Sequence, residues 1–418
     1  MWDPYGEFES AVLPNGLTVH VAHWPDRPWE AVGFLVHSGA EHDLVGLEGT
    51  AHFVEHLAFG NEGVPKNELK KFFENNGGDV NFGVTYYPYT KYNFFLPSDA
   101  KLLTQAFDIM GQGLLLTQFK NDIEHERKVI VKEFNLHYPH KHKIPLLFDF
   151  YKRKMLYEGH WFERFVRPLG TPKSINKITK LDLQTYYDVH YTPANMSIVC
   201  VGGMALSQIV EILSKSIFAI EKDGKRTPYP TPVIDSNSPK KVKCQSEVLM
   251  SLVGVFRKDA YYLSQAKDPS SISVSSLNVV RIMLNKVLHE EVREKRAWTY
   301  SISASFYNLR CFYEFSIHCN ALKRVSVKDI NDVIEGCIAG LSSREDLLDE
   351  AKRRVTISNT MVDLSGKVVC DSALSNLATY YRIRTLTEIN NEINSVTMED
   401  VREVLKWLTP ECRWTFTI

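Results

Sequence analysis

GTAHFVEHLAF, residues 49–59, contains two histidines four positions apart, His52 and His56, with Glu55 directly before the second. On an α-helix, positions i and i+4 lie on one face, one turn apart. Both imidazoles can therefore point at one metal ion, and Glu55 projects beside them. Glycines stand on both sides of the stretch, which suits a short helix. Its apolar positions, available for packing, are Ala51, Phe53, Val54, Leu57 and Ala58.

The same residues also fit a half-buried helix whose polar side chains are incidental and have no common function. A catalytic zinc site needs three protein ligands and one open position, so a third ligand must be found. In EHERKVIVKEFNLH, residues 124–137, Glu126 and Glu133 stand seven apart, about two helical turns, and share a helix face. One carboxylate could bind the metal while the other orients a ligand. A glutamate pair alone would equally fit a solvated helix face.

Around these stretches the N-terminal half mixes strands and helices. LTVHVAHW (17–24) and AVGFLVHSG (31–39) indicate strands, because β-branched and aromatic residues are bounded by Pro and Gly. Apolar periodicity predicts four helices and one further strand pair. The helices are expected over 47–60, 66–76, 98–116 and 119–136, and the strand pair near 78–96. Strict β-α alternation is missing, so the fold class is predicted to be α+β.

The chain contains a weak internal repeat. Residues 175–201 resemble residues 393–418, and each segment ends with a proline and an apolar strand. The identities in constant register are Ile175, Asn176, Thr179 and Asp182 with Ile393, Asn394, Thr397 and Asp400. We predict two homologous domains, each a mainly antiparallel sheet with helices packed on one face. The expected bounds are 1–221 for the N-terminal domain, 222–243 for a Pro- and Ser-rich linker and 244–418 for the C-terminal domain.

Composition narrows the function classes. With 418 residues and 44% hydrophobic content, the chain is long enough for more than one core. A formal net charge of −1 gives no reason to expect nucleic acid or an anionic membrane as a partner. No apolar run reaches the roughly 20 residues that cross a bilayer, and the first residues lack the pattern of a secretory signal.

The cysteines bear on the compartment. There are seven, an odd number, scattered mostly through apolar or strand-like runs. This pattern favours buried free thiols over a disulfide framework or a cysteine-rich zinc site. A reducing compartment, the cytoplasm, is therefore expected.

Taken together, the histidine stretch and the glutamate pair resemble the inverted zinc-peptidase signature H-x-x-E-H followed by E-x6-E on a separate helix. The chain resembles the pitrilysin/insulinase class of zinc metallopeptidases, in particular its half-size branch, typified by the β subunit of mitochondrial processing peptidase and bacterial relatives. Further matching stretches are LGTPKSINKIT (169–179), ANMSIVCVGG (194–203) and EVREKRAWTYSISASF (291–306).

The resemblance implies a set of site residues. In that family the third ligand follows the second histidine at a fixed distance, which makes Glu133 the ligand beside His52 and His56, and Glu126 its neighbour. Glu55 would be the general base that activates a zinc-bound water.

The resemblance also implies substrate-binding residues. Arg293 and Tyr300 correspond to a pair that reaches the active site from the second domain. The substrate would lie on an edge strand formed by Asn81, Phe82, Gly83, Val84 and Thr85. This strand departs from the family's N-A-x-T pattern by one extra residue and by Phe82 in place of Ala. Ala297 and Trp298 likewise replace the family's Gly-Leu next to the Arg/Tyr pair.

These residues predict a zinc-dependent endopeptidase that hydrolyses extended peptides or precursor and leader segments. As in half-size members of the family, a dimer is expected, either a homodimer or a heterodimer with a related peptidase-like chain. Two alternatives stay open: a zinc-bearing subunit that needs a partner chain for activity, and a non-catalytic structural subunit of the same fold.

Overall fold

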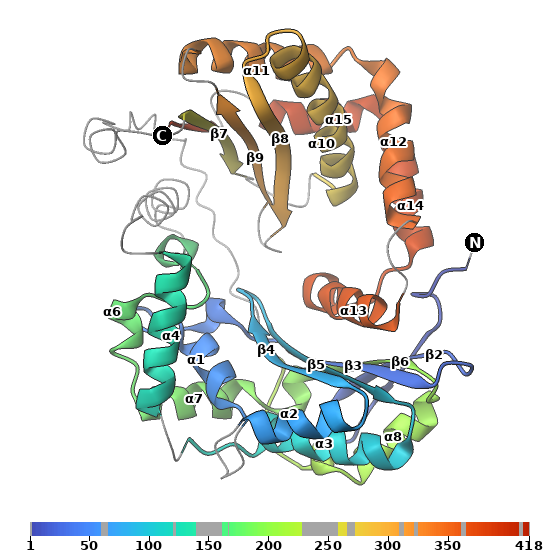
Figure 1. The fold of residues 1–418 in the computed structure, drawn as a ribbon. Coiled ribbons are helices and arrows are strands. Elements are labelled where there is room, and N and C mark those ends of the chain that lie inside the picture. Colours follow the sequence, from blue (N-terminus) through green and yellow to red (C-terminus); the bar gives the residue numbers. More distant parts are fainter. Residues whose placement is uncertain are drawn as a thin grey trace. The chain divides into compact units, whose positions relative to one another are not determined.

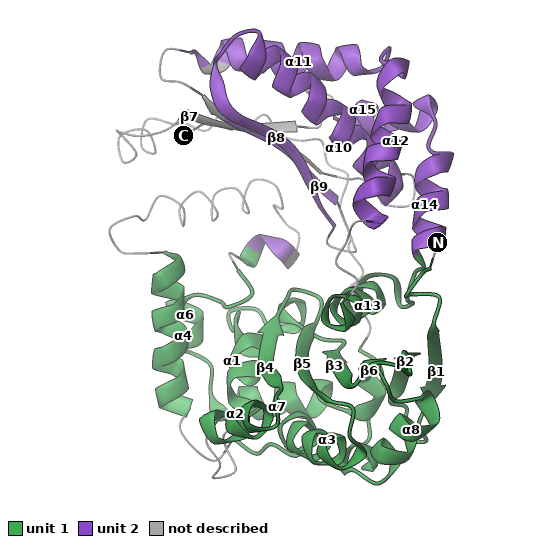
Figure 2. Cartoon of the chain, turned by 45° about the vertical axis from the view of Figure 1, so that its right-hand side comes forward, with its two compact units in different colours: residues 1–153, 164–230, 363–385 green, residues 154–163, 231–362, 386–418 purple. Residues whose placement is uncertain are grey.

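The computed structural model describes residues 2–59, 66–119, 123–138, 161–165, 167–227, 258–265, 272–308, 313–321, 325–360, 365–408 and 413–417. The chain divides into two compact units (Figure 2). The first contains most of residues 1–230 together with 363–385, and the second contains most of the remainder.

The first unit is built on a six-stranded sheet with the strand order β1-β2-β6-β3-β5-β4 (Figure 2). The pairs are antiparallel except β2 with β6, which is parallel. The sheet is therefore mainly antiparallel, as predicted, and β4 forms one of its edges. The strands are β1 Phe8–Val12, β2 Thr18–His23, β3 Trp29–Val36, β4 Asp79–Thr85, β5 Thr90–Pro97 and β6 Met196–Gly202.

Most helices of this unit pack on one face of the sheet. Phe34 of β3 stacks on Phe218 with ring centroids 5.4 Å apart and meets Phe107 of α3 at 6.0 Å, which places α3 on that face. The four helices expected from periodicity are all present as α1 to α4. The helices are α1 Thr50–Leu57, α2 Lys66–Asn75, α3 Ala100–Leu115, α4 Ile123–His137, α6 Pro172–Ile175, α7 Lys180–His190 and α8 Leu206–Ser214.

One helix, α13 (Gly366–Tyr380), covers part of the opposite face (Figure 1). A Cβ atom at Gly33 of β3 would lie 2.5 Å from Leu374 Cδ1 and 3.0 Å from Cys370 Sγ, so the missing side chain lets α13 approach the sheet. The predicted domain bounds placed residues 366–380 in the second domain, whereas they belong to the first unit. Helices were also expected on one face of each sheet only, and α13 lies on the other face. The physical reason is that β3 is apolar on both faces, and its second face also needs a cover.

The second unit has its own four-stranded antiparallel sheet, ordered β10-β7-β9-β8, and its own hydrophobic core. The strands are β7 Lys258–Gln265, β8 Thr299–Asn308, β9 Tyr313–Ala321 and β10 Arg413–Thr417. The helices are α10 Val274–Leu288, α11 Val327–Leu341, α12 Glu345–Thr360, α14 Leu386–Ser395 and α15 Met398–Trp407. Both units thus combine a mainly antiparallel sheet with helices, and the α+β fold class is confirmed.

The internal repeat corresponds to one local structure formed twice. Thr179 begins α7 with a capping box in which Asp182 accepts hydrogen bonds from the Thr179 backbone N at 2.8 Å and from its hydroxyl at 2.7 Å. Thr397 begins α15 in the same way, with both distances to Asp400 at 2.7 Å. Helix α7 is followed by strand β6, and α15 by strand β10. The four shared residues therefore mark the start of equivalent helix–strand units.

Three remaining expectations concern the linker, the cysteines and the membrane. Only residues 222–227 of the predicted linker are described. Cys200, Cys337 and Cys370 are free thiols and buried, and Cys319 is buried as well, whereas Cys244, Cys311 and Cys412 lie outside the described residues. Over the described ranges, no helix combines the length and the apolar character that crossing a bilayer requires.

Candidate active site and metal centre

The histidine stretch forms helix α1, and its start is fixed by a buried aspartate. The Asp43 carboxylate accepts hydrogen bonds from the backbone N of Gly49 at 2.7 Å and of Ala51 at 2.8 Å. These N–H groups belong to the first turn, where a helix has no partners of its own. Gly49 has a φ of +100°, and a Cβ there would lie 2.7 Å from the Leu169 carbonyl oxygen, so glycine is required at this turn.

Helix α4 lies beside α1 and is anchored by Arg127. The Arg127 guanidinium stands 5.3 Å from the centre of the Phe53 ring and donates hydrogen bonds to the carbonyl oxygens of Ile175 and Ile178. This arginine ties α4 to α1 and to the turn after α6. The sequence analysis gave Arg127 no role, although it lies in the quoted stretch 124–137 directly after Glu126.

Together α1 and α4 bring His52, His56 and Glu133 to one point. One ligand atom from each lies within 4.8 Å of the others. Glu133 Oε2 is 3.7 Å from His52 Nε2 and 3.4 Å from His56 Nε2. Ligand atoms about 2.0–2.2 Å from a tetrahedral zinc are separated by roughly 3.4 Å, so the donor types fit zinc and both distances to Glu133 are close to that spacing.

The Glu126 carboxylate contacts the side of the His56 ring that faces away from Glu133. Glu126 Oε2 lies 3.0 Å from His56 Nδ1, which leaves Nε2 directed at Glu133. Burial alone would lower the pKa of His56, but its hydrogen bonds to Glu126 and Glu133 outweigh burial and raise the pKa to about 9. A metal ion bound at Nε2 would displace this proton.

His52 has the opposite protonation preference. Burial, followed by the neighbouring His56, lowers the pKa of His52 to about 3, so its imidazole is neutral. The two rings stand 4.6 Å apart at 67°. Among the described residues, no hydrogen-bond partner reaches the buried Nδ1 of His52. A neutral imidazole with Nε2 turned toward a carboxylate is a suitable zinc donor.

Glu55 lies beside the three ligands without being one of them. Its side chain is buried, and Thr85 Oγ1 of β4 donates a hydrogen bond to Glu55 Oε2 at 2.9 Å. Burial raises the pKa of Glu55, while His56 and the Thr85 hydrogen bond lower it in part. A carboxylate whose pKa is raised by burial beside a set of candidate metal ligands has the properties of a general base.

Strand β4 is the edge strand on which a substrate was expected to lie, and it contains a β-bulge. Asn81 pairs with Asn93 and Val84 with Lys91, so Phe82 and Gly83 together oppose Tyr92. The bulge absorbs the extra residue noted in the sequence. The Phe82 ring packs 4.7 Å from Phe59, against the helix-covered core.

Two family models match the chain. One, described as "Insulinase (Peptidase family M16)", matches residues 18–155 and includes all three metal-site residues as well as Glu55. The other, described as "Peptidase M16 inactive domain", matches residues 177–355. The chain belongs to the M16 peptidase family.

Members of the M16 family are also found among curated relatives. The mitochondrial-processing peptidase subunit beta of Saccharomyces cerevisiae is 28% identical over 237 residues, which cover 56% of this chain and 49% of that protein. A Bacillus subtilis protein named uncharacterized zinc protease YmxG is 24% identical over 428 residues, which cover 95% of this chain and 94% of that protein. The chain spans less than half of the yeast subunit and 40% of the probable Arabidopsis thaliana subunit.

Solved structures show the same fold. The structure of a peptidase M16 inactive domain from Pseudomonas fluorescens gives a TM-score of 0.79 at 17% identity, covering 98% of this chain and 97% of that one. The structure of the first half of the periplasmic protease PqqL from Escherichia coli gives a TM-score of 0.77 at 17% identity, covering 98% of this chain and 91% of that one. The M16 fold thus extends over nearly the whole chain.

The second M16 unit contains Arg293 and Tyr300 in irregular backbone. Arg293 lies in a π-helical turn, η5 (His289–Glu294), and its Nη1 is 2.9 Å from His289 Nε2. Tyr300 is 82% exposed and follows Ala297, whose φ is +50°. The β8–β9 register also shifts after Thr299. A π-turn and a bulge are frequent at functional sites. A positive φ favours glycine, the residue that the family pattern implies at position 297.

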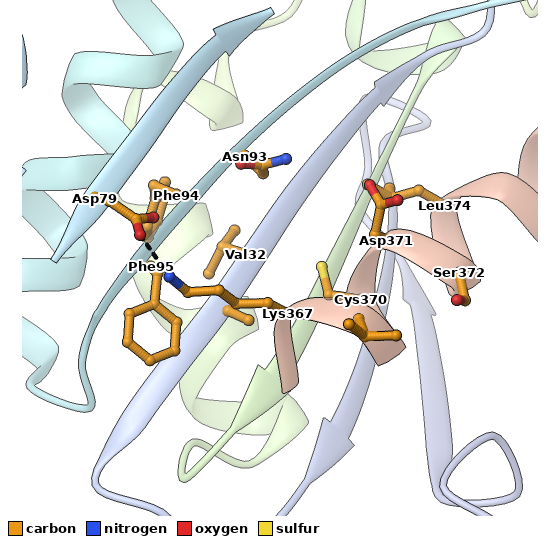
Figure 3. A pocket seen from close by; sticks show the side chains of 12 residues that line it. Val32, Asp79, Asn93, Phe94, Phe95, Lys367, Cys370, Asp371, Ser372 and Leu374 are labelled. Carbon is orange, nitrogen blue, oxygen red and sulfur yellow. Dashed lines mark hydrogen bonds and ion pairs between the residues drawn. The ribbon is translucent and has the colours of Figure 1, made fainter. Parts of the chain in front are cut away.

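The first unit also contains a pocket away from the His52–His56–Glu133 cluster, between α13 and the sheet (Figure 3). Its volume is about 340 Å³. At its rim Lys367 pairs with Asp79 at 2.5 Å. Asn93 pairs with Gly33 and therefore faces α13, whereas Thr85 faces Glu55 on the other side of the sheet. This pocket is thus separate from the His52–His56–Glu133 cluster. Its lining residues include Val32, Phe95, Cys370, Asp371 and Leu374.

Proposed function

We propose that this M16 chain is a zinc-dependent endopeptidase acting on extended peptides or on precursor and leader segments. The observation that supports it is the convergence of His52, His56 and Glu133 within 4.8 Å, with the buried Glu55 alongside. The first family model spans these residues, and relatives are named zinc proteases.

The three ligands would hold zinc, with Glu126 orienting His56 from behind. When bound, zinc supplies a Lewis acid that polarises a carbonyl oxygen and lowers the pKa of water toward about 7. Glu55 takes up the proton of the attacking water and delivers it to the leaving amine. Thr85 holds the Glu55 carboxylate through the 2.9 Å hydrogen bond, so the base is directed before substrate arrives.

Substrate would bind as an added strand at the β4 edge. Backbone groups of residues 81–85 would pair with the peptide, a mode that recognises the main chain more than side chains. The Phe82 side chain is partly buried against the core, so this residue would contribute through its backbone. Tyr300 and Arg293 of the second unit would donate hydrogen bonds to the developing oxyanion or to the peptide.

A dimer, either homodimeric or formed with a related peptidase-like chain, is proposed as the working assembly. Relatives named as β subunits of a processing peptidase favour the version with a partner. The two versions differ in a simple measurement, the size of the chain expressed alone compared with the chain co-expressed with a related peptidase-like chain. The cytoplasmic location stays a prediction.

The test combines zinc content with turnover of a fluorogenic peptide library. Glu55→Gln should retain about one zinc per chain and lose at least about 100-fold in kcat, because the base is removed while the ligands stay. Glu68→Gln, an exposed glutamate of α2 that pairs with Lys71, serves as the matched control. Absence of zinc from the unmodified chain would contradict the proposal. Zinc without turnover in the single chain, followed by turnover once a partner is added, would favour the heterodimer.

A further inference from the structure

Gly83 occupies a place where any side chain would enter the volume of Glu55. An ideal Cβ at this position would lie 2.3 Å from Glu55 Cγ, 2.6 Å from Oε1 and 2.7 Å from Cδ. All three distances are below what real Cβ atoms show, so one of the two residues would have to move. Gly83 also has a φ of +140°, which L side chains rarely adopt.

Glu55 has little room to retreat. It is buried on α1, directly after Phe53 and Val54, which are fully inside the core. Its Oε2 accepts the Thr85 hydroxyl hydrogen bond at 2.9 Å. The start of α1 is held in turn by the Asp43 carboxylate.

Strand β4 is equally constrained on its side of the contact. The Phe82 ring lies 4.7 Å from Phe59 and 6.5 Å from Phe73, so it is partly buried against the core. Asn81 Oδ1 accepts a hydrogen bond from the Gly83 backbone N at 3.1 Å. Pairing with β5 continues on both sides of the bulge. The β4 bulge is therefore held in place, and it leaves no room for a side chain between residue 83 and the Glu55 carboxylate.

We propose that Gly83 is a positioning residue for Glu55. Because residue 83 has no side chain, the bulge can close over Glu55 and keep its carboxylate against Thr85 and next to the His52–His56–Glu133 cluster. A side chain at position 83 displaces the base while the metal ligands, which lie on α1 and α4, stay in place. This inference rests on the proposed peptidase function for its catalytic consequence, but its structural part can be tested without activity.

The first experiment compares Gly83→Ala with Gly77→Ala. Gly77 also has a positive φ, +74°, but a Cβ there would meet nothing within 4 Å, so it reports backbone strain alone. We expect Gly83→Ala to keep about one zinc per chain, to lose at least about 100-fold in kcat and to keep KM within about threefold. Gly77→Ala should keep kcat within about twofold. A raised KM with unchanged kcat in Gly83→Ala would overturn the inference, because it would mean that Gly83 acts only in peptide binding.

The second experiment is a thermal-unfolding cycle on metal-free protein, using Gly83→Ala, Glu55→Ala and the double variant. Gly83→Ala should lower Tm by about 5 °C, and Glu55→Ala should remove at least half of that loss because the clashing atoms are gone. If Gly83→Ala alone does not fold, folding of the double variant would support the same contact. Equal losses in both backgrounds would overturn the inference. The failure of the proposed function would look different. The unfolding cycle would still show coupling between Gly83 and Glu55, but the unmodified chain would bind zinc and cleave no peptide.

Discussion

His56 shows how one side chain at the site serves two carboxylates. Glu126 binds its Nδ1 at 3.0 Å, and Glu133 lies 3.4 Å from its Nε2. The first contact holds the proton on Nδ1, and the second shows that Nε2 faces the cluster, where a metal ion would take the place of its proton.

Replacing Glu126 by Gln should therefore weaken zinc binding by about 10–100-fold without removing a ligand. The amide no longer fixes the imidazole as a carboxylate does. Competition with a chromophoric chelator would measure the change. Glu74→Gln, an exposed glutamate of α2 paired with Lys70 at 3.0 Å, is the control and should bind zinc like the unmodified chain.

A buried histidine away from the cluster makes stability depend on pH. Burial, followed by the neighbouring His42, lowers the pKa of His190 from 6.5 to about 3. The unfolded chain then binds a proton below pH 6.5 that the folded chain does not bind, so stability is lost as pH falls from 6.5 toward 3.

At pH 5 this single residue should cost about 2 kcal/mol relative to pH 7. Urea unfolding of the unmodified chain and of His190→Gln at both pH values would measure the difference. The variant should show a smaller loss between pH 7 and pH 5. An identical pH dependence in both proteins would rule out His190 as a source.

Among the elements, α1 and α3 start with comparable aspartates in different surroundings. Asp43 is buried and accepts two backbone N–H groups at the start of α1, whereas Asp99 is exposed and accepts two at the start of α3, both at 2.9 Å. Removing a cap costs about 1 kcal/mol, and a buried unpaired donor adds to that cost.

Asp43→Ala should therefore lower the free energy of unfolding by about 2–3 kcal/mol, and Asp99→Ala by about 1 kcal/mol. Only Asp43→Ala should also weaken zinc binding, because α1 carries both histidine ligands. Denaturant titration and chelator competition on the two variants would show the difference. Equal zinc affinities would mean that α1 keeps its position without this cap.

Much of this element-level picture could be predicted from sequence. The i, i+4 histidines and the seven-residue glutamate spacing gave the correct faces of α1 and α4, because helical geometry is local. The β4 bulge appeared in the sequence only as an extra residue, since register depends on pairing with β5. Asp43 and Arg127 were missed, because their partners at Gly49, Ala51, Ile175 and Ile178 are brought near by the fold.

On the scale of the whole molecule, the least predictable feature was the membership of α13 in the first unit. Its residues follow most of the second unit in sequence, and no local pattern links Leu374 to Gly33 of β3. The sequence repeat, by contrast, revealed the two-unit plan, because Thr179–Asp182 and Thr397–Asp400 form matching capping boxes.

Leu374→Ala should destabilise the first unit by about 2–5 kcal/mol although it lies late in the chain. Calorimetry should show which unfolding transition belongs to the first unit, because added zinc raises the melting temperature of the unit that binds it. Calorimetry should show the zinc-sensitive transition moving down in Leu374→Ala. Ile357→Ala, a half-exposed residue of α12 in the second unit, should leave that transition unchanged.

The place of α13 in the chain has a consequence for biosynthesis. During synthesis β3 leaves the ribosome early. The helix that covers its second face, α13, is made only from residue 366 on, when most of the second unit has already been synthesised. Until then Ala31, Gly33 and Leu35 lack a covering helix in a nascent chain. Truncated products that end before α13 should therefore bind chaperones and aggregate, while the full-length product is released.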